Sequence, residues 1–362
     1  MEPTLTELEE KTFTEDDYAE VPPGDIVAYN ELRSCADLFR MHQQKILTIQ
    51  PEFQRDVVWK GPDQTRFIDS LIKSLPIPSM CFALDHRAQQ WIVIDGLQRI
   101  ATIVKFLEGG DWNLSSLDDI DPAIAGKSVA AIKQESNPLH QFYTRVENLS
   151  VPVTVLRCDF KKKNHMEYLF TIFHRLNTGG MKLNNQEIRN CIYTGSFNVL
   201  LRELDKYPAW RRINKMQPKQ QYRFTKQEII LRFFAFYDRA ATYEGQLAKF
   251  LNSYMHENQN PPQEFLEAKR TLFKQTLDCI SGKVFAEANP PKLSVTVLEA
   301  ILVAVAKNIA TLTVETPTEL HTRFETLIQH PDFSENSLKE GLSKKPRVIG
   351  RLQTAELIFA DQ

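Results

Sequence analysis

The chain has 362 residues, of which 42% are hydrophobic, with 44 basic residues, 46 acidic residues and five cysteines. A chain of this size can bury a sizeable core without disulfides or metals, and at roughly 100 to 200 residues per domain it predicts two domains. No apolar run approaches the roughly 18 residues that a membrane span needs, so neither a membrane-spanning nor a mainly disordered protein is expected.

Charge is unevenly distributed along the chain. The net charge is −2, yet the first 26 residues hold nine acidic side chains and one basic side chain, a local net charge of −8. The remaining 336 residues therefore carry a net charge of +6. We interpret residues 1–27 as an acidic N-terminal arm on a mildly basic body, which is a first indication of an anionic partner.

Several common sequence signatures are missing. The cysteines are odd in number and scattered, without a C-x-x-C pair, so a disulfide framework or a structural zinc site is not expected. The first ten residues lack the basic and apolar segments of a signal peptide, which favours a cytoplasmic protein. The phosphate loop of P-loop NTPases, the dinucleotide-binding turn and the hydrolase nucleophile elbow do not occur.

The first part of the chain mixes predicted helices and strands. Apolar positions at helical spacing between Pro62 and Leu75, with Pro76 just beyond, predict a helix. The apolar runs 80–84 and 91–94 predict a β-hairpin or two adjacent strands. The segment Asp95–Arg99 follows the second run directly, and the next apolar residues predict a helix that ends at Gly109-Gly110.

The later part of the chain becomes entirely helical. A helix within 122–133, a strand over 151–158 and an aromatic-rich helix that leads into Arg175 come first. Asn184 with Glu187 and Thr225 with Glu228 each predict a capping box at a helix start, and 293–312 predicts a long apolar helix. We therefore expect an α+β protein, with an N-terminal domain at 28–200 and an all-helical domain at 201–362.

The segment Asp95–Arg99 has the pattern of an anion-binding turn. The free N–H groups at the start of a helix attract negative charge, Gly96 lets a phosphate approach the backbone, and Arg99 can bind it bidentately. The alternative is that Asp95 caps the helix and Arg99 forms a surface ion pair.

Four groups of residues occur together in a distinctive order: Pro51–Arg55 with Trp59, Leu71–Ile72 leading into Leu75–Pro78, Ile94–Arg99, and Phe173 with Arg175–Gly180 and Leu183–Asn190. In order and spacing they resemble the N-terminal domain of GmrSD-type modification-dependent restriction enzymes, over roughly residues 30–240. The resemblance implies a ParB/sulfiredoxin-like fold with a small mixed sheet. It also implies that the Asp-Gly-Gln-Gln-Arg loop of the family binds nucleotide and supports NTP hydrolysis that regulates DNA cleavage.

The resemblance also implies site residues by position. The catalytic candidates are Asp95, which is also the candidate ligand for Mg²⁺, Gln98 and Arg99, and the nucleotide-binding candidates are Arg55, Gly96, Arg175 and Asn177. This sequence has Leu97 where the family usually has Gln, so binding could persist while hydrolysis is weakened, unless Leu97 only packs. The isolated tripeptide His256-Glu257-Asn258 does not form an HNH nuclease pattern.

Residues 202–232 carry nine bases against three acids, interleaved with Tyr207, Trp210, Tyr222 and Phe224, whose rings could pack on sugars or bases. A solvated surface is the alternative. The candidate DNA-binding residues are Arg211, Arg212, Lys215 and Lys219.

These observations lead to one principal hypothesis and two rivals. The principal hypothesis is a cytoplasmic regulatory subunit of a bacterial DNA restriction or phage-defence system that binds an NTP and Mg²⁺, with NTP hydrolysis as a further candidate activity. It acts with a separate HNH-type nuclease chain. The first rival is a non-enzymatic DNA-binding sensor. The second is a metal-dependent DNA nickase that uses Asp95.

Overall fold

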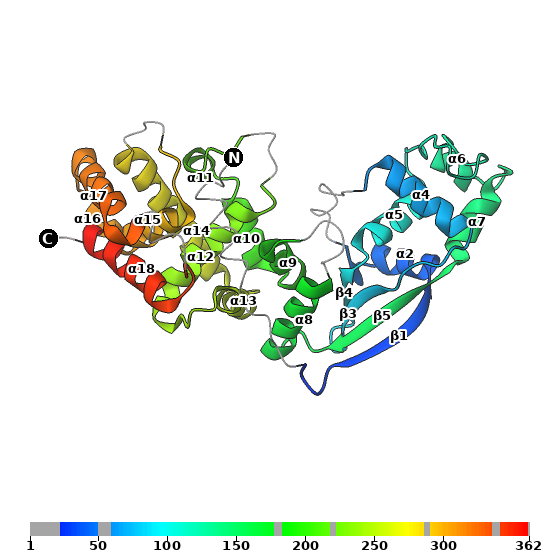
Figure 1. Ribbon diagram of the computed structural model, residues 1–362, viewed down its shortest axis with the longest axis horizontal. Helices are drawn as coiled ribbons and strands as arrows, with labels where there is room; N and C mark the ends of the chain where they lie inside the picture. Colours follow the sequence, from blue (N-terminus) through cyan, green and yellow to red (C-terminus); the bar gives the residue numbers. More distant parts are fainter. Residues whose placement is uncertain are drawn as a thin grey trace. The chain divides into compact units, whose positions relative to one another are not determined.

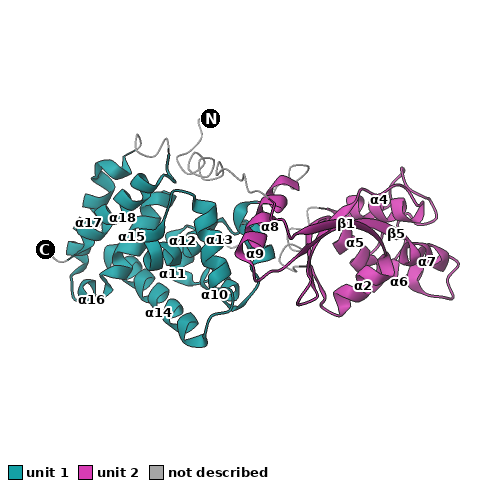
Figure 2. Ribbon diagram, turned by 90° about the horizontal axis from the view of Figure 1, so that it is seen from below, with its two compact units in different colours: residues 1–19, 184–362 teal, residues 20–183 magenta. Residues whose placement is uncertain are grey.

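The computed structural model describes residues 22–49, 59–176, 183–217, 222–285, 290–334 and 341–360. The chain divides into two compact units between Leu183 and Asn184 (Figure 2). Residues 20–183 contain all the described strands, and we call them the sheet unit; residues 184–362 form the helical unit. Most of the expected acidic arm, residues 1–21, lies outside the described residues.

The sheet unit is built on five strands in the order β1-β5-β3-β4-β2 (Figure 1). The β1/β5 and β3/β4 pairs are antiparallel, whereas β3/β5 and β2/β4 are parallel, so the sheet is mixed. The strands are β1 (Val27–Ser34), β2 (Leu47–Thr48), β3 (Met80–Asp85), β4 (Gln90–Asp95) and β5 (Ser150–Cys158). The helices are α2 (Cys35–Gln43), α4 (Gly61–Ile72), α5 (Leu97–Glu108), α6 (Val129–Lys133), α7 (His140–Asn148) and α8 (Lys163–Leu176).

One core holds this unit together. Apolar residues of α2, α4, α5 and α7 pack on the side chains of alternating strand residues, among them Trp91, Val93, Val153 and Val155. Because successive strand residues point to opposite faces, Ile92 and Thr154 belong to the other face of the sheet. Helix α8 packs against β4. The core therefore fixes the end of β4, where Asp95 lies.

The helical unit contains no strand among its described residues. Its elements are α9 (Asn185–Ile192), α10 (Ser196–Leu204), α11 (Pro208–Ile213), α12 (Thr225–Arg239), η1 (Ala240–Thr242), α13 (Leu247–Glu257), α14 (Gln263–Cys279), the π-helical turn η2 (Ile280–Val284), α15 (Val295–Lys307), α16 (Ile309–Leu312), α17 (Pro317–Gln329), η3 (Pro331–Phe333) and α18 (Lys345–Phe359). Helix α15 lies at its centre, since every residue from Val295 to Ala306 is buried. The expected α+β class is thus confirmed.

The structure tests the expected elements individually. The β3/β4 hairpin, the helix that ends at Gly109 and the capping box of Asn184 with Glu187 are confirmed. The capping box of Thr225 with Glu228 is wrong, because α12 has Phe224 at its N-cap and the Glu228 carboxylate binds arginines instead. The helix expected over 293–312 is split at Asn308 into α15 and α16.

Strand β1 was not expected from the sequence. It lies at an edge of the sheet, and most of its residues are exposed on both faces, including Val27, Tyr29 and Leu32. A half-buried strand shows an alternation of apolar and polar residues, and β1 does not have that alternation. Its position is determined by backbone pairing with β5 over eight residue pairs.

Among the described residues, no helix is both long enough and apolar enough to cross a membrane.

Candidate functional site

The turn between β4 and α5 has an open helix start. Asp95 is the last residue of β4, Gly96 is the N-cap with φ of +94°, and α5 begins at Leu97. The first hydrogen bond of the helix runs from Ile100 N to Gly96 O, at 2.9 Å. No side chain of the described residues caps this helix, so the alternative is wrong in giving Asp95 the role of its cap, although the ion pair of Arg99 that it expected is present, with Asp95. The N–H groups of the first turn are therefore available to an anion.

Gly96 is required by the fold of the turn itself. A left-handed φ is strained for residues with a Cβ, and a Cβ at this position would lie 2.5 Å from Cγ of Met80. Met80 is the first residue of β3 and belongs to the core. The close approach of the turn to β3 thus explains the glycine without any ligand.

Arg99 is held in one orientation by two contacts. Its Nη2 donates to Oδ2 of Asp95 at 2.8 Å, and its Nη1 donates to the carbonyl oxygen of Pro78. The Arg99 side chain is 14% exposed, whereas that of Asp95 is 41% exposed. Burial lowers the pKa of Arg99, and the charge of Asp95 opposes that shift. Asp95 therefore balances the charge of a guanidinium that is mostly removed from water, while the Asp95 carboxylate itself stays accessible to solvent.

Leu97 and Gln98 occupy different environments. Leu97 packs against the core of the sheet unit, as its helical register with the following apolar residues suggests. The Oε1 atom of Gln98 is buried and has no hydrogen-bond donor among the described residues. A buried amide oxygen without a donor costs about 1–3 kcal/mol, so Gln98 is the residue of the turn that packing alone does not explain.

The other expected nucleotide-binding residues are placed only in part. Arg175 is exposed in the last turn of α8, the helix that packs against β4. Arg55 and Asn177 lie outside the described residues. In the described part of the chain, no group of three or more His, Cys, Asp or Glu side chains could hold a metal ion. A single carboxylate such as Asp95 still suits Mg²⁺, which commonly binds one or two carboxylates together with phosphate oxygens and water.

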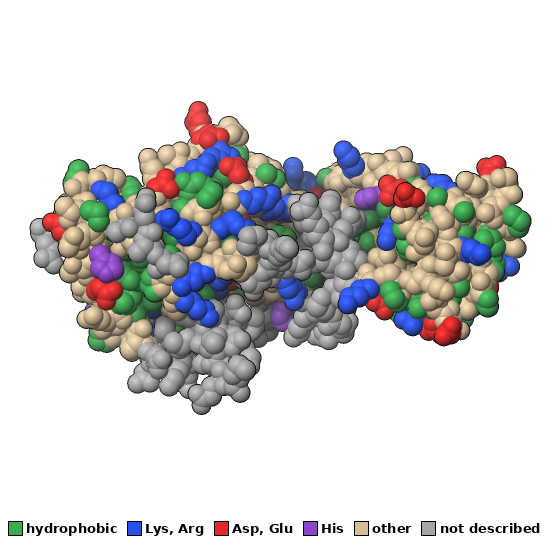
Figure 3. Space-filling model, turned by 90° about the horizontal axis from the view of Figure 1, so that it is seen from above, with side chains coloured by type: hydrophobic (Ala, Val, Ile, Leu, Met, Phe, Trp, Pro, Cys, Tyr) green, Lys and Arg blue, Asp and Glu red, His purple; other side chains and the backbone are tan. Residues whose placement is uncertain are grey.

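The basic stretch 202–232 does not form a single surface. Arg211 and Arg212 lie at the end of α11, where Arg212 donates to the Ser281 hydroxyl, and Lys215 follows it exposed. Arg232 is buried, and Trp210 is fully buried, so the expectation that this ring packs on DNA is wrong. Lys219 lies outside the described residues. Lys and Arg side chains are scattered over the visible face of the helical unit (Figure 3).

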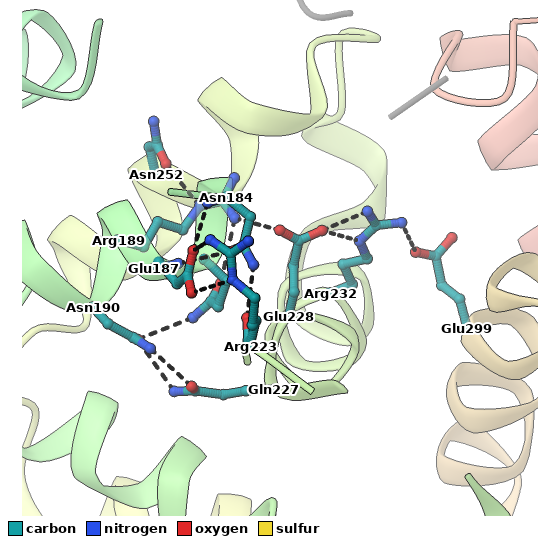
Figure 4. Close-up of polar contacts among 11 residues, drawn as sticks. Asn184, Glu187, Arg189, Asn190, Arg223, Gln227, Glu228, Arg232, Asn252 and Glu299 are labelled. Atoms are coloured by element: carbon teal, nitrogen blue, oxygen red, sulfur yellow. Dashed lines mark hydrogen bonds and ion pairs between the residues drawn. The ribbon is translucent and has the colours of Figure 1, made fainter. Parts of the chain in front are cut away.

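A buried polar network, which the sequence did not reveal, occupies the helical unit (Figure 4). Every residue of α9 is buried, although most are polar. Oε2 of Glu228 accepts from Nη1 of Arg189 at 2.9 Å, and Oε1 accepts from Nη2 of Arg232 at 2.6 Å. Arg232 also lies 3.9 Å from Glu299 of α15. Burial alone would raise the pKa of Glu228, but the charges of Arg232 and Arg189 outweigh it and lower the pKa.

The same network joins α9 to Arg223, to α13 and, through a second contact, to α12. Glu187 caps α9 and accepts two hydrogen bonds from the guanidinium of Arg223, at 2.9 and 2.6 Å. Nδ2 of Asn190 donates to Oε1 of Gln227 in α12 at 3.0 Å, and Nε of Arg189 donates to Asn252 in α13 at 2.8 Å. The sequence segment Leu183–Asn190 therefore contributes mainly to the interior of the helical unit. The signal was present in the sequence as five polar residues in the eight-residue helix, a pattern that does not fit a simple amphipathic helix.

Comparison with known proteins gives a family match for part of the chain. Residues 35–194 match the family model described as the GmrSD restriction endonuclease, N-terminal domain. This segment runs from α2 to just beyond α9 and contains the Asp95–Arg99 turn. Comparison with curated proteins and comparison with solved structures each gave no match. Residues 35–194 are therefore similar to the N-terminal domain of the GmrSD restriction endonuclease, and this similarity associates the chain with DNA restriction and phage defence.

Proposed function

We propose that the sheet unit binds the phosphates of a nucleoside triphosphate with Mg²⁺ at the β4–α5 turn, and that this binding regulates DNA cleavage by an HNH-type nuclease outside residues 1–362. One observation carries the proposal. The start of α5, which no described side chain caps, presents N–H groups beside a guanidinium that Asp95 and Pro78 hold in place. Because the N–H groups of α5 and the guanidinium of Arg99 are already held in place, little side-chain entropy is lost when a phosphate binds to them.

Each residue of the turn has a distinct part in this proposal. The N–H groups of the first turn of α5 donate to phosphate oxygens, and Arg99 adds a fixed positive charge. Arg99 contacts Oδ2 of Asp95, which leaves Oδ1 to bind Mg²⁺ or to orient a water molecule. The metal would neutralise phosphate charge once bound.

Hydrolysis would depend on fewer groups than in relatives with Gln in place of Leu97. Leu97 has no hydrogen-bonding side chain and packs on the core, so it cannot orient water. Gln98 and Asp95 are the remaining polar side chains of the turn that could do so. We therefore propose nucleotide binding as the principal activity and slow hydrolysis as its extension.

Thermal unfolding with each of the four NTPs and Mg²⁺ tests the binding. We expect at least one NTP to raise the melting temperature of the wild-type protein and to leave that of Arg99→Ala unchanged. Arg157→Ala is the matched control, because Arg157 is an exposed arginine on β5 whose strand position is opposite Leu84 rather than near Asp95. Calorimetric titration of Arg99→Lys, which keeps the charge, should show weakened binding. Equal stabilisation of wild type and Arg99→Ala would overturn the proposal.

A DNA contact at α11 is a second candidate function. Arg211 lies in the last turn of α11, Lys215 is exposed just beyond it, and the matching family model is that of a restriction endonuclease. If they bind duplex DNA, Arg211→Ala with Lys215→Ala should weaken binding and flatten its dependence on salt, because fewer counterions are released. Lys307→Ala, in the same unit, is the control, since that amine is paired with Glu356. Binding that is indifferent to salt and to the paired substitution would exclude this contact.

A further inference from the structure

A row of polar side chains crosses the sheet beside the Asp95–Arg99 turn. It starts next to Pro78, whose carbonyl oxygen holds Arg99. Oγ of Ser79 lies 3.0 Å from Oγ1 of Thr154, and Oγ1 of Thr154 donates to Oδ1 of Asn30 at 2.8 Å. The row therefore begins one residue from a contact of Arg99 and ends on the edge strand β1.

The hydrogen bonds of this row run in one direction. The Thr154 hydroxyl has one hydrogen, and it is directed to Asn30. The hydroxyl hydrogen of Ser79 has two acceptors in reach, the carbonyl oxygen of Met80 at 3.2 Å and Oγ1 of Thr154 at 3.0 Å, and donation to Thr154 keeps two oxygen lone pairs from facing each other. The outer lone pairs of Ser79 Oγ can consequently accept a hydrogen bond. At the other end, Asn30 uses its oxygen inside the row, so its Nδ2 group is directed to donate.

The row lies where a ligand could reach it. It is on the face of the sheet opposite the main core, because Val153 and Val155, the neighbours of Thr154, point into that core. Ser79 and Asn30 are exposed, and Thr154 is partly exposed. Adjacent strands lie about 4.8 Å apart, so the row extends on the order of 10 Å from Ser79, just before β3, across β5 to β1. That length suits the ribose and base of a nucleotide whose phosphates lie at the turn.

We propose that this row is the nucleoside subsite of the phosphate site, and that it selects ribonucleotides. Ser79 Oγ accepts a hydrogen bond from a ribose hydroxyl, and Asn30 Nδ2 donates to an acceptor atom of the base. Thr154 is a positioning residue, since it fixes the direction of both hydrogen bonds. The inference rests on the proposed function, because it requires that phosphates bind at Asp95–Arg99.

The test compares probes that contain different parts of a nucleotide. The dissociation constants of the best-binding NTP, its 2′-deoxy and 3′-deoxy forms, and inorganic tripolyphosphate are measured by calorimetry on the full chain with Mg²⁺. Wild type should bind the ribonucleotide about five-fold more tightly than one of the deoxy forms, the ratio that one neutral hydrogen bond supplies. Ser79→Ala should abolish that ratio, and Asn30→Ala should weaken NTP binding by about five-fold. Neither variant should change the affinity for tripolyphosphate.

Controls separate this inference from the proposed function. Ser150→Ala removes an exposed hydroxyl elsewhere on β5 and should behave as wild type. Thr154→Val keeps the side-chain shape and should reduce the ratio of the dissociation constants of the deoxy form and the ribonucleotide, although residue 154 touches no ligand atom in this proposal. A wild-type protein without preference for ribose, or an unchanged ratio in Ser79→Ala, overturns the subsite while leaving the phosphate site intact. Failure of every nucleotide and of tripolyphosphate to bind overturns both.

Discussion

Replacing Glu228 by Gln should destabilise the helical unit while preserving the shape of the side chain. Glu228 lies between Arg189 and Arg232, whose side chains are only 1% and 4% exposed. Removing its charge takes away the carboxylate that both buried guanidinium groups contact, while Glu299 lies 3.9 Å from Arg232. Breaking a buried ion pair on one side costs about 3–5 kcal/mol, and we expect the lower end because Gln can still accept a hydrogen bond.

Native-state hydrogen exchange can localise this loss. About 3 kcal/mol corresponds to a protection factor roughly 150-fold lower for amides of α12 and α15 that exchange through opening of the helical unit. Amides of β3 and β5, in the sheet unit, should be unaffected. Glu257→Gln is the matched control, since Glu257 pairs with Arg239 in the same unit but the two side chains are 44% and 27% exposed. A surface pair of this kind contributes about 1 kcal/mol or less.

The pH dependence gives a second measure of the same effect. Because the pKa of Glu228 is lowered in the folded protein, its contribution to stability is fully present above the ordinary glutamate pKa of 4.5 and is lost as the pH falls through the folded value. Glu228→Gln should lack this pH-dependent contribution to the stability of the helical unit. If α12 and α15 exchange at the same rate in Glu228→Gln and Glu257→Gln, the network does not stabilise the unit and our reasoning is refuted.

Two further predictions concern the sheet unit. Gly96→Ala should lower the free energy of unfolding by about 1–3 kcal/mol, because it combines φ of +94° with a Cβ 2.5 Å from Met80. Gly110→Ala, whose Cβ meets nothing within 4 Å, is the control and should be nearly neutral. Equal melting temperatures of the two variants would show that Gly96 does not relieve strain. The hydrogen bonds of Asp25 with Lys162 and His165 lower its pKa to about 2, so stability from this contact is present above the ordinary Asp value of 3.8 and is lost as the pH falls toward 2. Asp25→Asn should remove that part of the acid dependence of the melting temperature. If wild type and Asp25→Asn show the same dependence of melting temperature on pH, this contact does not contribute to stability.

Local sequence patterns determined the elements that lead to the site. These patterns are Pro62 near the start of α4, the two short apolar runs of β3 and β4, and Gly109 at the end of α5. Each acts over a few residues, so it could be recognised in the sequence directly. The turn Asp95–Arg99 was located in the same way, whereas the pairing of Asp95 with Arg99 came from the structure. The family that these motifs indicated was confirmed over residues 35–194.

Other features depended on contacts between distant parts of the chain. Strand β1 is defined by its pairing with β5, more than a hundred residues away, and its own side chains carry no alternating pattern. The row from Ser79 through Thr154 to Asn30 likewise joins strands β5 and β1 to the residue that precedes β3. Thr225 and Glu228 have the spacing of a capping box, but the charges of Arg189 and Arg232 bind the carboxylate more strongly than a backbone N–H would.

The sequence by itself therefore determined the α+β class and the position of the Asp95–Arg99 turn, and it indicated the family that residues 35–194 match, because short-range periodicity and turn chemistry specify them. The basic stretch at 202–232 shows the limit of that information. A count of charges cannot tell an exposed arginine from a buried one, and only the tertiary structure placed Arg232 in the interior while leaving Lys215 on the surface. The physical reason is that burial and ion pairing are properties of the packed chain, decided by residues that are far apart in sequence.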